Sequence, residues 1–241
     1  MSHSEAARRG GKFSGIDVVI LAGGLGTRLK SVISDRPKVL ADVGGRPFLD
    51  ILIKDLLKTG FERIILSTGH LKDKIKDHYA GKGIFFAEEE SPLGTGGGIK
   101  NAEPLVQGEN FLAMNGDSWI AGGVDLAALY DFHNKKNALV TIALTRPRSE
   151  KDYGAVFLDD DGKILAFNEK NKEEKDHFLN AGIYFMKKDV FSRMPSYPFS
   201  IESDFFPKLV GDGLYGFVVE GEVIDIGTPE RYEAAKKISN W

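Results

Sequence analysis

An alternation of apolar and amphipathic segments in the first half of the chain restricts the possible folds more than any other feature. Residues 18–21 are apolar and end at two glycines. A helical pattern of apolar residues begins after Pro47 and stops at Gly60, since proline suits the start of a helix and glycine its end. The same order recurs as far as Asn115. It predicts right-handed crossovers and a mostly parallel sheet.

The second half of the chain has a different pattern. Two strand-like segments flank the turn Asp160-Asp161-Gly162, which indicates a β-hairpin and antiparallel pairing. We therefore expect an α/β fold, a Rossmann-like three-layer sandwich with a mostly parallel mixed sheet. Residues 1–15 are expected to be a disordered tail or tag, and 16–241 a single domain with halves of about 16–144 and 145–241. The further expected segments are strands at 63–68, 84–87, 111–115, 153–158, 164–168, 178–186, 214–219 and 223–226, and helices at 71–79, 97–102, 201–210 and 228–237.

Composition excludes several classes of function. The 32 basic and 35 acidic residues give a net charge of −3, which offers no excess positive charge for a nucleic-acid backbone or a membrane surface. No apolar run is long enough to span a bilayer. The chain has no cysteine, which excludes disulfides, thiolate metal sites and a cysteine nucleophile, and is typical of a cytoplasmic protein.

A glycine-rich loop follows the first predicted strand and is the densest chemical signal. Glycine lets the backbone approach a ligand closely, and basic side chains bind phosphate groups. The spacing is neither the dinucleotide fingerprint nor a Walker A loop. It predicts a triphosphate cradle. The expected nucleotide-binding residues of this loop are Leu21, Ala22, Gly23, Gly24, Gly26 and Thr27, and the expected catalytic residues, which would hold phosphates, are Arg28 and Lys38.

A second glycine-rich loop, residues 91–98, carries Gly94 and Thr95 and again lies between a strand and a helix. The two loops should meet at the carboxyl edge of the sheet, where α/β proteins bind ligands. Glu88, Glu89 and Glu90 come just before it. A carboxylate can accept hydrogen bonds from N1 and N2 of guanine, although a solvated strand end is an equal alternative for each of the three.

Two aspartates stand at predicted strand ends among small neighbours. Asp117 follows Asn115-Gly116, and Asp225 precedes Ile226-Gly227. Mg²⁺ usually takes one or two carboxylates together with phosphate oxygens, whereas a lone aspartate at a strand end is more often a cap. We expect these two residues to bind Mg²⁺.

Six segments together resemble the sugar-1-phosphate nucleotidyltransferases, and their order and spacing agree from Val18 onward. Within that family, the glutamate-rich strand and the 199–206 segment are similar to the D-glycero-α-D-manno-heptose-1-phosphate guanylyltransferases. The resemblance implies a GT-A-like nucleotidyltransferase fold. The six segments are Gly23-Gly24-Leu25-Gly26-Thr27-Arg28 with Pro37-Lys38, Leu93-Gly94-Thr95-Gly96-Gly97, Asn115-Gly116-Asp117, Glu169-Lys170, Asn180-Ala181-Gly182-Ile183-Tyr184, and Asp225-Ile226-Gly227-Thr228-Pro229.

The resemblance implies a role for each matched residue. The backbone at Leu21, Gly23 and Gly24 would hold the nucleoside, with Glu89 and Gly94 beside the base. It implies that Glu169 contacts sugar hydroxyls, that Lys170 binds the sugar phosphate, and that Asn180 and Gly182 contact the sugar ring. Some relatives place an arginine on the sugar phosphate near 201–204; here Arg193 lies too early in the sequence.

The implied reaction transfers a nucleoside monophosphate from a nucleoside triphosphate, GTP, to a sugar 1-phosphate, D-glycero-D-manno-heptose 1-phosphate. It would give GDP-heptose and pyrophosphate, with Mg²⁺ as cofactor. The sugar phosphate is already an anionic nucleophile, so no general base is required. Two alternatives stay open: a uridylyltransferase acting on an amino-sugar or hexose 1-phosphate, and a non-catalytic sugar-nucleotide-binding regulator. A homo-oligomer is compatible with the sequence.

Overall fold

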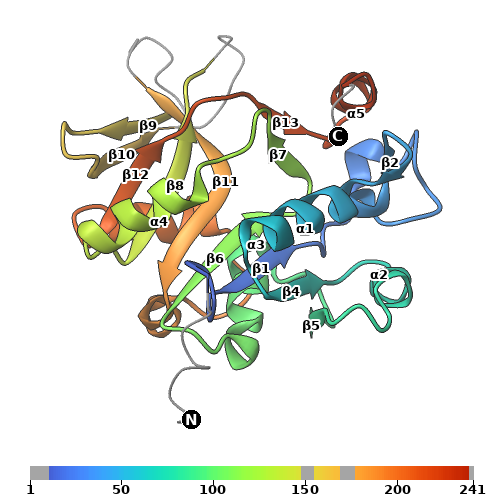
Figure 1. Ribbon diagram of the computed structural model, residues 1–241, viewed down its shortest axis with the longest axis horizontal. Helices are drawn as coiled ribbons and strands as arrows, with labels where there is room; N and C mark the ends of the chain where they lie inside the picture. The colour runs from blue at the N-terminus through green and yellow to red at the C-terminus, as the bar shows by residue number, and fades with distance from the viewer. Residues whose placement is uncertain (1–10, 148–154, 169–176, 239–241) are drawn as a thin grey trace, which may run out of the picture.

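The computed structural model describes residues 11–147, 155–168 and 177–238. Within these ranges a nine-stranded mixed sheet forms the centre of the molecule, and helices lie against it (Figure 1). The strand order along the main path is β10-β9-β11-β6-β1-β4-β5, and β8 and β12 continue from β11. The expected mixed α/β architecture is confirmed.

One part of the sheet is wholly parallel. Strand β1 (Asp17–Leu21) lies between β6 (Asn110–Asn115) and β4 (Arg63–Thr68), and β5 (Phe85–Glu88) pairs with β4. In the register, Leu21 lies opposite both Ser67 and Asn115. The loops that leave these strands therefore start at one edge of the sheet, as the sequence predicted.

The direction of pairing changes at β11 (Phe178–Lys187). This strand is antiparallel to β6 on one side and to β8 (Val140–Thr145) and β9 (Ala155–Leu158) on the other. Strand β10 (Ile164–Asn168) forms the predicted hairpin with β9, while β12 (Leu214–Val218) runs parallel to β8. The second half of the chain thus extends the sheet with mainly antiparallel pairs.

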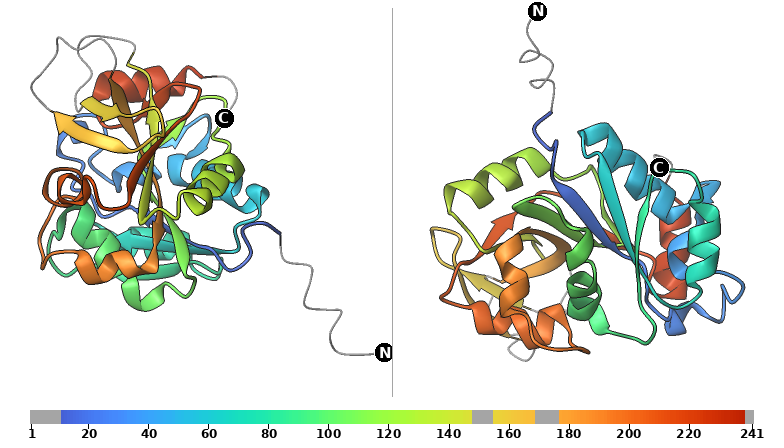
Figure 2. Two further views of the ribbon diagram at one scale, coloured as in Figure 1. Left: turned by 90° about the vertical axis from the view of Figure 1, so that its left-hand side faces the viewer. Right: turned by 90° about the horizontal axis from the view of Figure 1, so that it is seen from below.

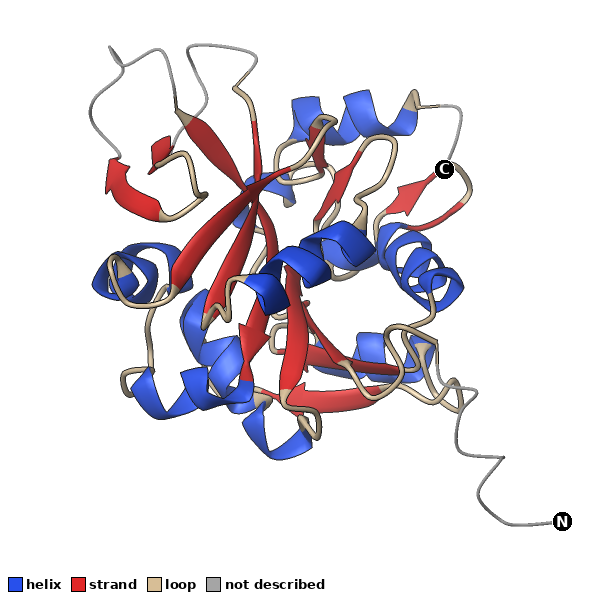
Figure 3. Ribbon diagram, turned by 60° about the vertical axis from the view of Figure 1, so that its left-hand side comes forward, coloured by secondary structure: helices blue, strands red, loops and turns tan. Residues whose placement is uncertain are grey.

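Helices cover both faces of the sheet (Figures 2 and 3). Alternate residues of β1 show the two layers: Val18 packs in one apolar cluster with Leu49, and Val19 packs in the other with Ile99. The cluster of Val18 contains residues of α1 (Phe48–Thr59), α2 (Lys72–His78), α4 (Leu126–Lys135) and α5 (Pro229–Lys236). The cluster of Val19 contains residues of α3 (Gly94–Asn101) and of the short helices η5 (Lys188–Arg193), η6 (Ile201–Phe205) and η7 (Phe206–Leu209).

Two predicted helices differ from the structure. The segment 201–210 forms a π turn, η6, and then a 3₁₀ turn, η7, because Pro207 lacks the N–H that a continuous helix needs. Helix α3 begins at Gly94, three residues before its expected start. Elements that the sequence did not predict are helix α4, strands β2 (Asp42–Val43), β3 (Arg46–Pro47), β7 (Ser118–Ile120) and β8, and the 3₁₀ turns η2 (Thr27–Leu29), η3 (Lys38–Leu40), η4 (Glu103–Leu105) and η5.

The N-terminal segment joins the fold earlier than expected. Residues 1–10 of the predicted tail lie outside the described ranges, but Phe13 is only 3% exposed. Its ring stacks on Phe61 with a centroid separation of 4.3 Å. The prediction of a tail to residue 15 is therefore wrong for this part, because one buried aromatic inside a polar leader gives no periodic signal. Within the described ranges, no helix has the length and apolar character needed to cross a membrane.

Candidate active site

A cavity of about 320 Å³ lies at the carboxyl edge of the parallel strands, between the two glycine-rich loops. The end of β6 and the residue Lys38 complete its wall. The site residues predicted from the sequence that line it are Leu21, Ala22, Gly23, Gly24, Lys38, Glu89, Gly94, Thr95 and Asp117, and its other lining residues are Leu25, Val39, Pro92 and Asn115. Residues from both loops thus share one cavity.

The first glycine loop leaves open space. A Cβ atom on Gly24 would have no heavy atom within 4 Å, whereas one on Gly23 would lie 3.1 Å from Oε1 of Glu89. Gly26 has a φ of +58° and leads into η2. Gly26, Thr27 and Arg28 do not line the cavity; the exposed Arg28 extends toward Gly227, with Nη2 3.6 Å from the position of a Cβ there.

Of the three consecutive glutamates, Glu89 is the one whose side chain lines the cavity. Glu88 pairs with Lys76 at 2.7 Å, and Glu90 pairs with Lys72 at 2.9 Å, so both side chains contact α2. The sequence could not separate the three. The ion pairs of Glu88 and Glu90 with lysines of α2 show which glutamate is left to line the cavity.

The Glu89 carboxylate is fixed by two hydrogen bonds. Oε1 accepts from the Ser67 hydroxyl at 3.1 Å, and Oε2 accepts from the Leu93 backbone N–H at 3.3 Å. Burial raises the pKa of Glu89, and these two hydrogen bonds act in the opposite direction. Each carboxylate oxygen has more than one acceptor site, so both can still accept from a ligand.

Phe199 of the same chain packs against the glycines of the second loop. The backbone N–H groups of Gly96 and Gly97 donate to the carbonyl of Phe199 at 3.1 and 3.3 Å. A Cβ on Gly96 would lie 2.1 Å from the Phe199 ring, and one on Gly94, where φ is +77°, would lie 2.4 Å from the Phe199 carbonyl oxygen. The first N–H groups of α3 are therefore used internally, which explains why the helix begins at Gly94.

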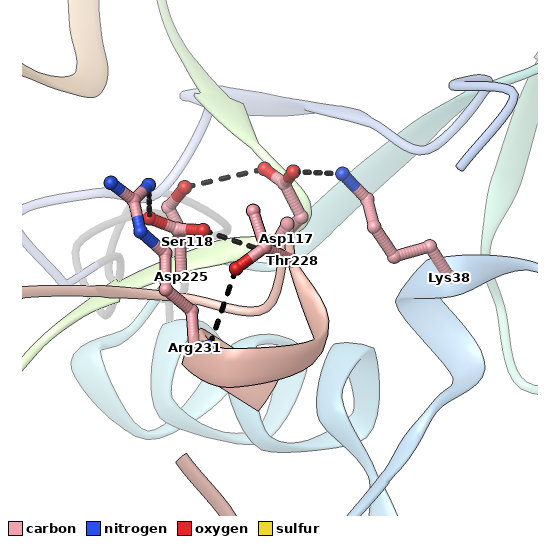
Figure 4. Close-up of polar contacts among 7 residues, drawn as sticks. Lys38, Asp117, Ser118, Asp225, Thr228 and Arg231 are labelled. Carbon is pink, nitrogen blue, oxygen red and sulfur yellow. Dashed lines mark hydrogen bonds and ion pairs between the residues drawn. The ribbon is translucent and has the colours of Figure 1, made fainter. Parts of the chain in front are cut away.

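Pairing between two remote segments builds the acidic part of the site. Strand β13 (Val223–Asp225) is antiparallel to β7, with Asp225 opposite Ser118. The backbone N–H of Ile226 donates to the carbonyl of Asp117 at 3.0 Å. Asp117 and Asp225 consequently lie side by side (Figure 4).

Both aspartates have cationic partners. Asp117 forms an ion pair with Lys38, whose side chain is 15% exposed. Asp225 accepts from Nη1 of Arg231 at 2.7 Å and from the backbone N–H of Gly227 at 2.8 Å. The sequence analysis missed Arg231, although it lies in the first turn of α5, three residues after the capping residue Thr228.

The aspartate pair fits a magnesium ion by its chemistry. No group of three or more His, Asp or Glu side chains in metal-binding proximity occurs across the described ranges. Two adjacent carboxylates are nevertheless sufficient, because Mg²⁺ commonly takes one or two of them and completes its shell with phosphate oxygens and water. Asp117 and Asp225 would be the protein ligands.

The expected sugar-binding residues are only partly described. Glu169 and Lys170 lie outside the described ranges. Asn180 donates from Nδ2 to the Tyr184 hydroxyl at 3.0 Å, and Gly182, with φ at +72°, packs against Asn115. A Cβ on Gly182 would lie 2.4 Å from Nδ2 of that asparagine.

Arg193 is not part of the cavity wall. It forms an exposed ion pair with Asp212. The sequence analysis expected this, because Arg193 precedes the segment 201–204, near which some relatives carry a phosphate-binding arginine.

The profile of the family described as "Nucleotidyl transferase" matches residues 17–240, so the chain belongs to the nucleotidyltransferase family and is an enzyme of that class. A mannose-1-phosphate guanylyltransferase of Mycobacterium tuberculosis (strain ATCC 25618 / H37Rv) is 36% identical over 90% of this chain and 62% of its own length. A D-glycero-alpha-D-manno-heptose 1-phosphate guanylyltransferase of Aneurinibacillus thermoaerophilus is 36% identical over 92% of this chain and 97% of its own length.

A solved structure agrees with this assignment. The crystal structure of HddC from Yersinia pseudotuberculosis complexed with GMP-PN superposes with a TM-score of 0.76 and 36% identity. The match covers 92% of this chain and 98% of the other. The resemblance inferred from the sequence is confirmed at the level of family and fold. The chain spans less than two thirds of the length of the mannose-1-phosphate relative but nearly all of the heptose-1-phosphate relative.

Proposed function

We propose that this enzyme transfers GMP from GTP to D-glycero-α-D-manno-heptose 1-phosphate. An oxygen of the sugar phosphate forms a bond to the α-phosphorus of GTP, and the bond between the α-phosphorus and the bridging oxygen breaks. GDP-heptose and pyrophosphate are the products. Support for guanylyl transfer comes from relatives with that activity in their names and from the similarity to a structure with bound GMP-PN.

The observation that carries the choice of base is the Glu89 carboxylate, which lines the cavity between the two glycine-rich loops. Glu89 is fixed by Ser67 and by the Leu93 N–H, and it stands over Gly23 at the end of the parallel strands. Guanine presents two neighbouring donors, N1–H and the N2 amino group, that can bond to one carboxylate. Adenine, uracil and cytosine cannot offer this pair, and each would leave the half-buried carboxylate short of partners.

The proposed phosphate-binding residues are Lys38 and Arg28. Lys38 extends from η3 into the cavity beside Asp117, and Arg28 lies outside the cavity lining, close to Gly227. Because the nucleophile is already an anion, the protein has mainly to hold the reacting groups in line and to stabilise the charge of the departing pyrophosphate. Lys38, in contact with Asp117, and Arg28, near Gly227, supply two cations for that task.

We propose Mg²⁺ at Asp117 and Asp225. A bound Mg²⁺ would neutralise triphosphate charge. In that state the two carboxylates would hold the ion, while Lys38 and Arg231, which now neutralise them, would become available to phosphate oxygens. The observation in favour is that the pairing of β13 with β7 brings the two aspartates close together and that each has a cation in contact.

The sugar half of the proposal depends on residues 145–241. Asn180 and Gly182 lie on β11, where Gly182 packs against Asn115, and both are proposed to contact the sugar ring. Glu169 and Lys170 are proposed to bind sugar hydroxyls and the sugar phosphate. Residues 16–144 would then bind the nucleotide. Both substrates are cytoplasmic metabolites in this proposal, and a chain without cysteine suits that compartment.

Pyrophosphate release, measured with each of four nucleoside triphosphates against a panel of sugar 1-phosphates, tests the proposal. The panel includes heptose, mannose, glucose and N-acetylglucosamine 1-phosphates. Fast release with GTP and the heptose is the expected result. Preference for UTP with an amino-sugar phosphate would favour the uridylyltransferase, and binding without pyrophosphate release would favour a regulator.

A further inference from the structure

The two carboxylate oxygens of Asp225 have donors of different kinds. Oδ1 accepts from the backbone N–H of Gly227 at 2.8 Å, and Oδ2 accepts from Nη1 of Arg231 at 2.7 Å. The first donor is neutral and lies two residues further along the chain. The second is a cation on α5, so one oxygen of this carboxylate is taken by a positive charge (Figure 4).

Asp117 shows the same arrangement. Oδ1 accepts from the hydroxyl of the neighbouring Ser118 at 3.2 Å, and Oδ2 accepts from Nζ of Lys38. All four oxygens of the two aspartates therefore have a donor, and their two negative charges are matched by the positive charges of Lys38 and Arg231. A metal ion that used both carboxylates as ligands would compete with these two cations for them.

Arg231 is the more exposed of the two cations. Its side chain is 55% exposed, against 15% for that of Lys38. Among the described residues, no hydrogen bond or ion pair of its guanidinium is seen besides that to Asp225. The backbone N–H of Arg231 donates to the Thr228 hydroxyl at 3.3 Å, so the start of α5 is capped independently of where the side chain points.

A guanidinium in this place suits a phosphate group. Arginine has five donors in a planar fork that can hold a phosphate through two hydrogen bonds. Oxygen ligands of one Mg²⁺ lie about 2.0–2.1 Å from the ion, and hence within about 4 Å of each other. A phosphate oxygen that shared an ion with Asp225 would therefore be within reach of the Arg231 side chain.

We propose that Arg231 is a phosphate-binding residue that occupies Asp225 until the metal and the triphosphate bind together. Asp225 is then released to the ion and Arg231 moves to a phosphate oxygen, while Lys38 makes the corresponding change at Asp117. Free metal binds weakly, and the metal and the triphosphate each strengthen the binding of the other. The inference rests on the proposed function, in which the two aspartates hold Mg²⁺.

Arg231→Gln is the direct test, because it removes the positive charge and keeps the backbone N–H that donates to Thr228. Arg231→Lys restores the charge. Lys236→Gln is the matched control, since Lys236 is also an exposed cation of α5 but pairs with Glu233, at 2.9 Å. A double variant, Arg231→Gln with Asp225→Asn, removes the carboxylate as well.

The first measurement is the dissociation constant of Mn²⁺ without nucleotide, obtained by electron paramagnetic resonance. Mn²⁺ prefers the same oxygen ligands as Mg²⁺. Arg231→Gln should bind Mn²⁺ about 3- to 10-fold more tightly than the wild type, whereas Arg231→Lys and Lys236→Gln should stay within about 2-fold of it. The double variant should lose the gain.

The second measurement is the dissociation constant of a non-cleavable GTP analogue at saturating Mg²⁺. Arg231→Gln should weaken binding of the analogue about 3- to 10-fold through the lost phosphate contact, and Lys236→Gln should leave it unchanged. The two affinities of Arg231→Gln thus move in opposite directions. A merely structural role of Arg231 would weaken both.

Unchanged Mn²⁺ affinity in Arg231→Gln, a gain that survives in the double variant, or unchanged affinity for the analogue would each overturn the inference. Failure of the proposed function has a different result, because the wild type would then release no pyrophosphate from GTP. The Mn²⁺ titrations contain no nucleotide and are independent of that result.

Discussion

The two glycine-rich loops are alike in sequence but use glycine for opposite reasons. At Gly24 of the first loop, a side chain would enter empty space. At Gly94 and Gly96 of the second loop, a side chain would collide with Phe199 of the same chain. Both loops line one cavity, yet only the first leaves room for a ligand next to its glycine backbone.

A glycine-rich loop in the sequence can therefore have either of two structural roles. The second loop is a structural wall whose first amide groups are already bonded to the Phe199 carbonyl. The proposed function places the phosphates at the first loop and at its neighbours Lys38 and Asp117. Substitutions near the first loop should therefore change catalysis, and substitutions within the second loop should change stability.

The largest effect is expected from the acidic pair beside the first loop. Asp117→Asn and Asp225→Asn should each lower turnover about 100- to 1,000-fold, because a neutral amide cannot offset the charge of a metal ion or lysine. Steady-state kinetics over a magnesium titration measure this. Asp212→Asn, which alters an exposed ion pair outside the cavity wall, is the control. Near-normal turnover at saturating Mg²⁺ would remove that aspartate from the site.

Lys38→Ala should have an effect on turnover of similar or slightly smaller size. The lysine is expected to stabilise charge that develops during transfer, so kcat should fall more than the Michaelis constant for the sugar phosphate rises. Lys76→Ala removes a lysine that pairs with Glu88 outside the cavity, and it should leave both constants unchanged. If Lys38→Ala changes only the Michaelis constants, the residue acts in ground-state binding.

The comparison of the loops is tested by a pair of alanine substitutions. Gly94→Ala should lower the free energy of unfolding by about 1–3 kcal/mol, since its Cβ would lie 2.4 Å from the Phe199 carbonyl oxygen and its φ is positive. Gly24→Ala should leave the melting temperature nearly unchanged and should weaken GTP binding. Thermal unfolding measures the stability of both variants, and a GTP titration measures their affinity for the nucleotide. Equal loss of stability in the two would refute the distinction.

The smallest predicted effect concerns the stability of Glu89→Gln. Burial raises the pKa of Glu89 in the folded protein above its value in the unfolded chain. The protonated group therefore contributes its full stabilisation below the unfolded-state pKa, and this contribution is lost as the pH rises through the folded-state pKa. The charged carboxylate is therefore unfavourable for folding at neutral pH. Glu89→Gln should melt slightly higher than the wild type at pH 7, and the gain should shrink toward about pH 4. A variant less stable at pH 7 would show that the bonds from Ser67 and Leu93 outweigh burial.

Sequence alone predicted the parts of this molecule that depend on local pattern. The strand 63–68 and the helix that ends at Gly60 lie where periodicity and end signals placed them. The meeting of the two glycine-rich loops at one edge of the sheet was also predicted, because parallel strands bring their carboxyl ends to the same edge. The cap at Thr228 was found from its position before Pro229.

Features that depend on contacts between remote segments were not predictable in this way. The short strand β7 has three residues and no pattern of its own, yet its pairing with β13 brings Asp225 to Asp117. The hydrogen bond between Thr95 and Glu202 joins residues far apart in the sequence, and the selection of Glu89 depends on lysines of α2. Each requires the tertiary structure.

The central claim, that Glu89 makes this enzyme a guanylyltransferase, is tested most directly by kcat/KM for all four nucleoside triphosphates in the wild type and in Glu89→Gln. The wild type should prefer GTP by about 100- to 10,000-fold, and the variant should lose much of that preference while using the other triphosphates as well as before. A wild-type preference for UTP, or unaltered GTP selectivity in Glu89→Gln, would contradict it.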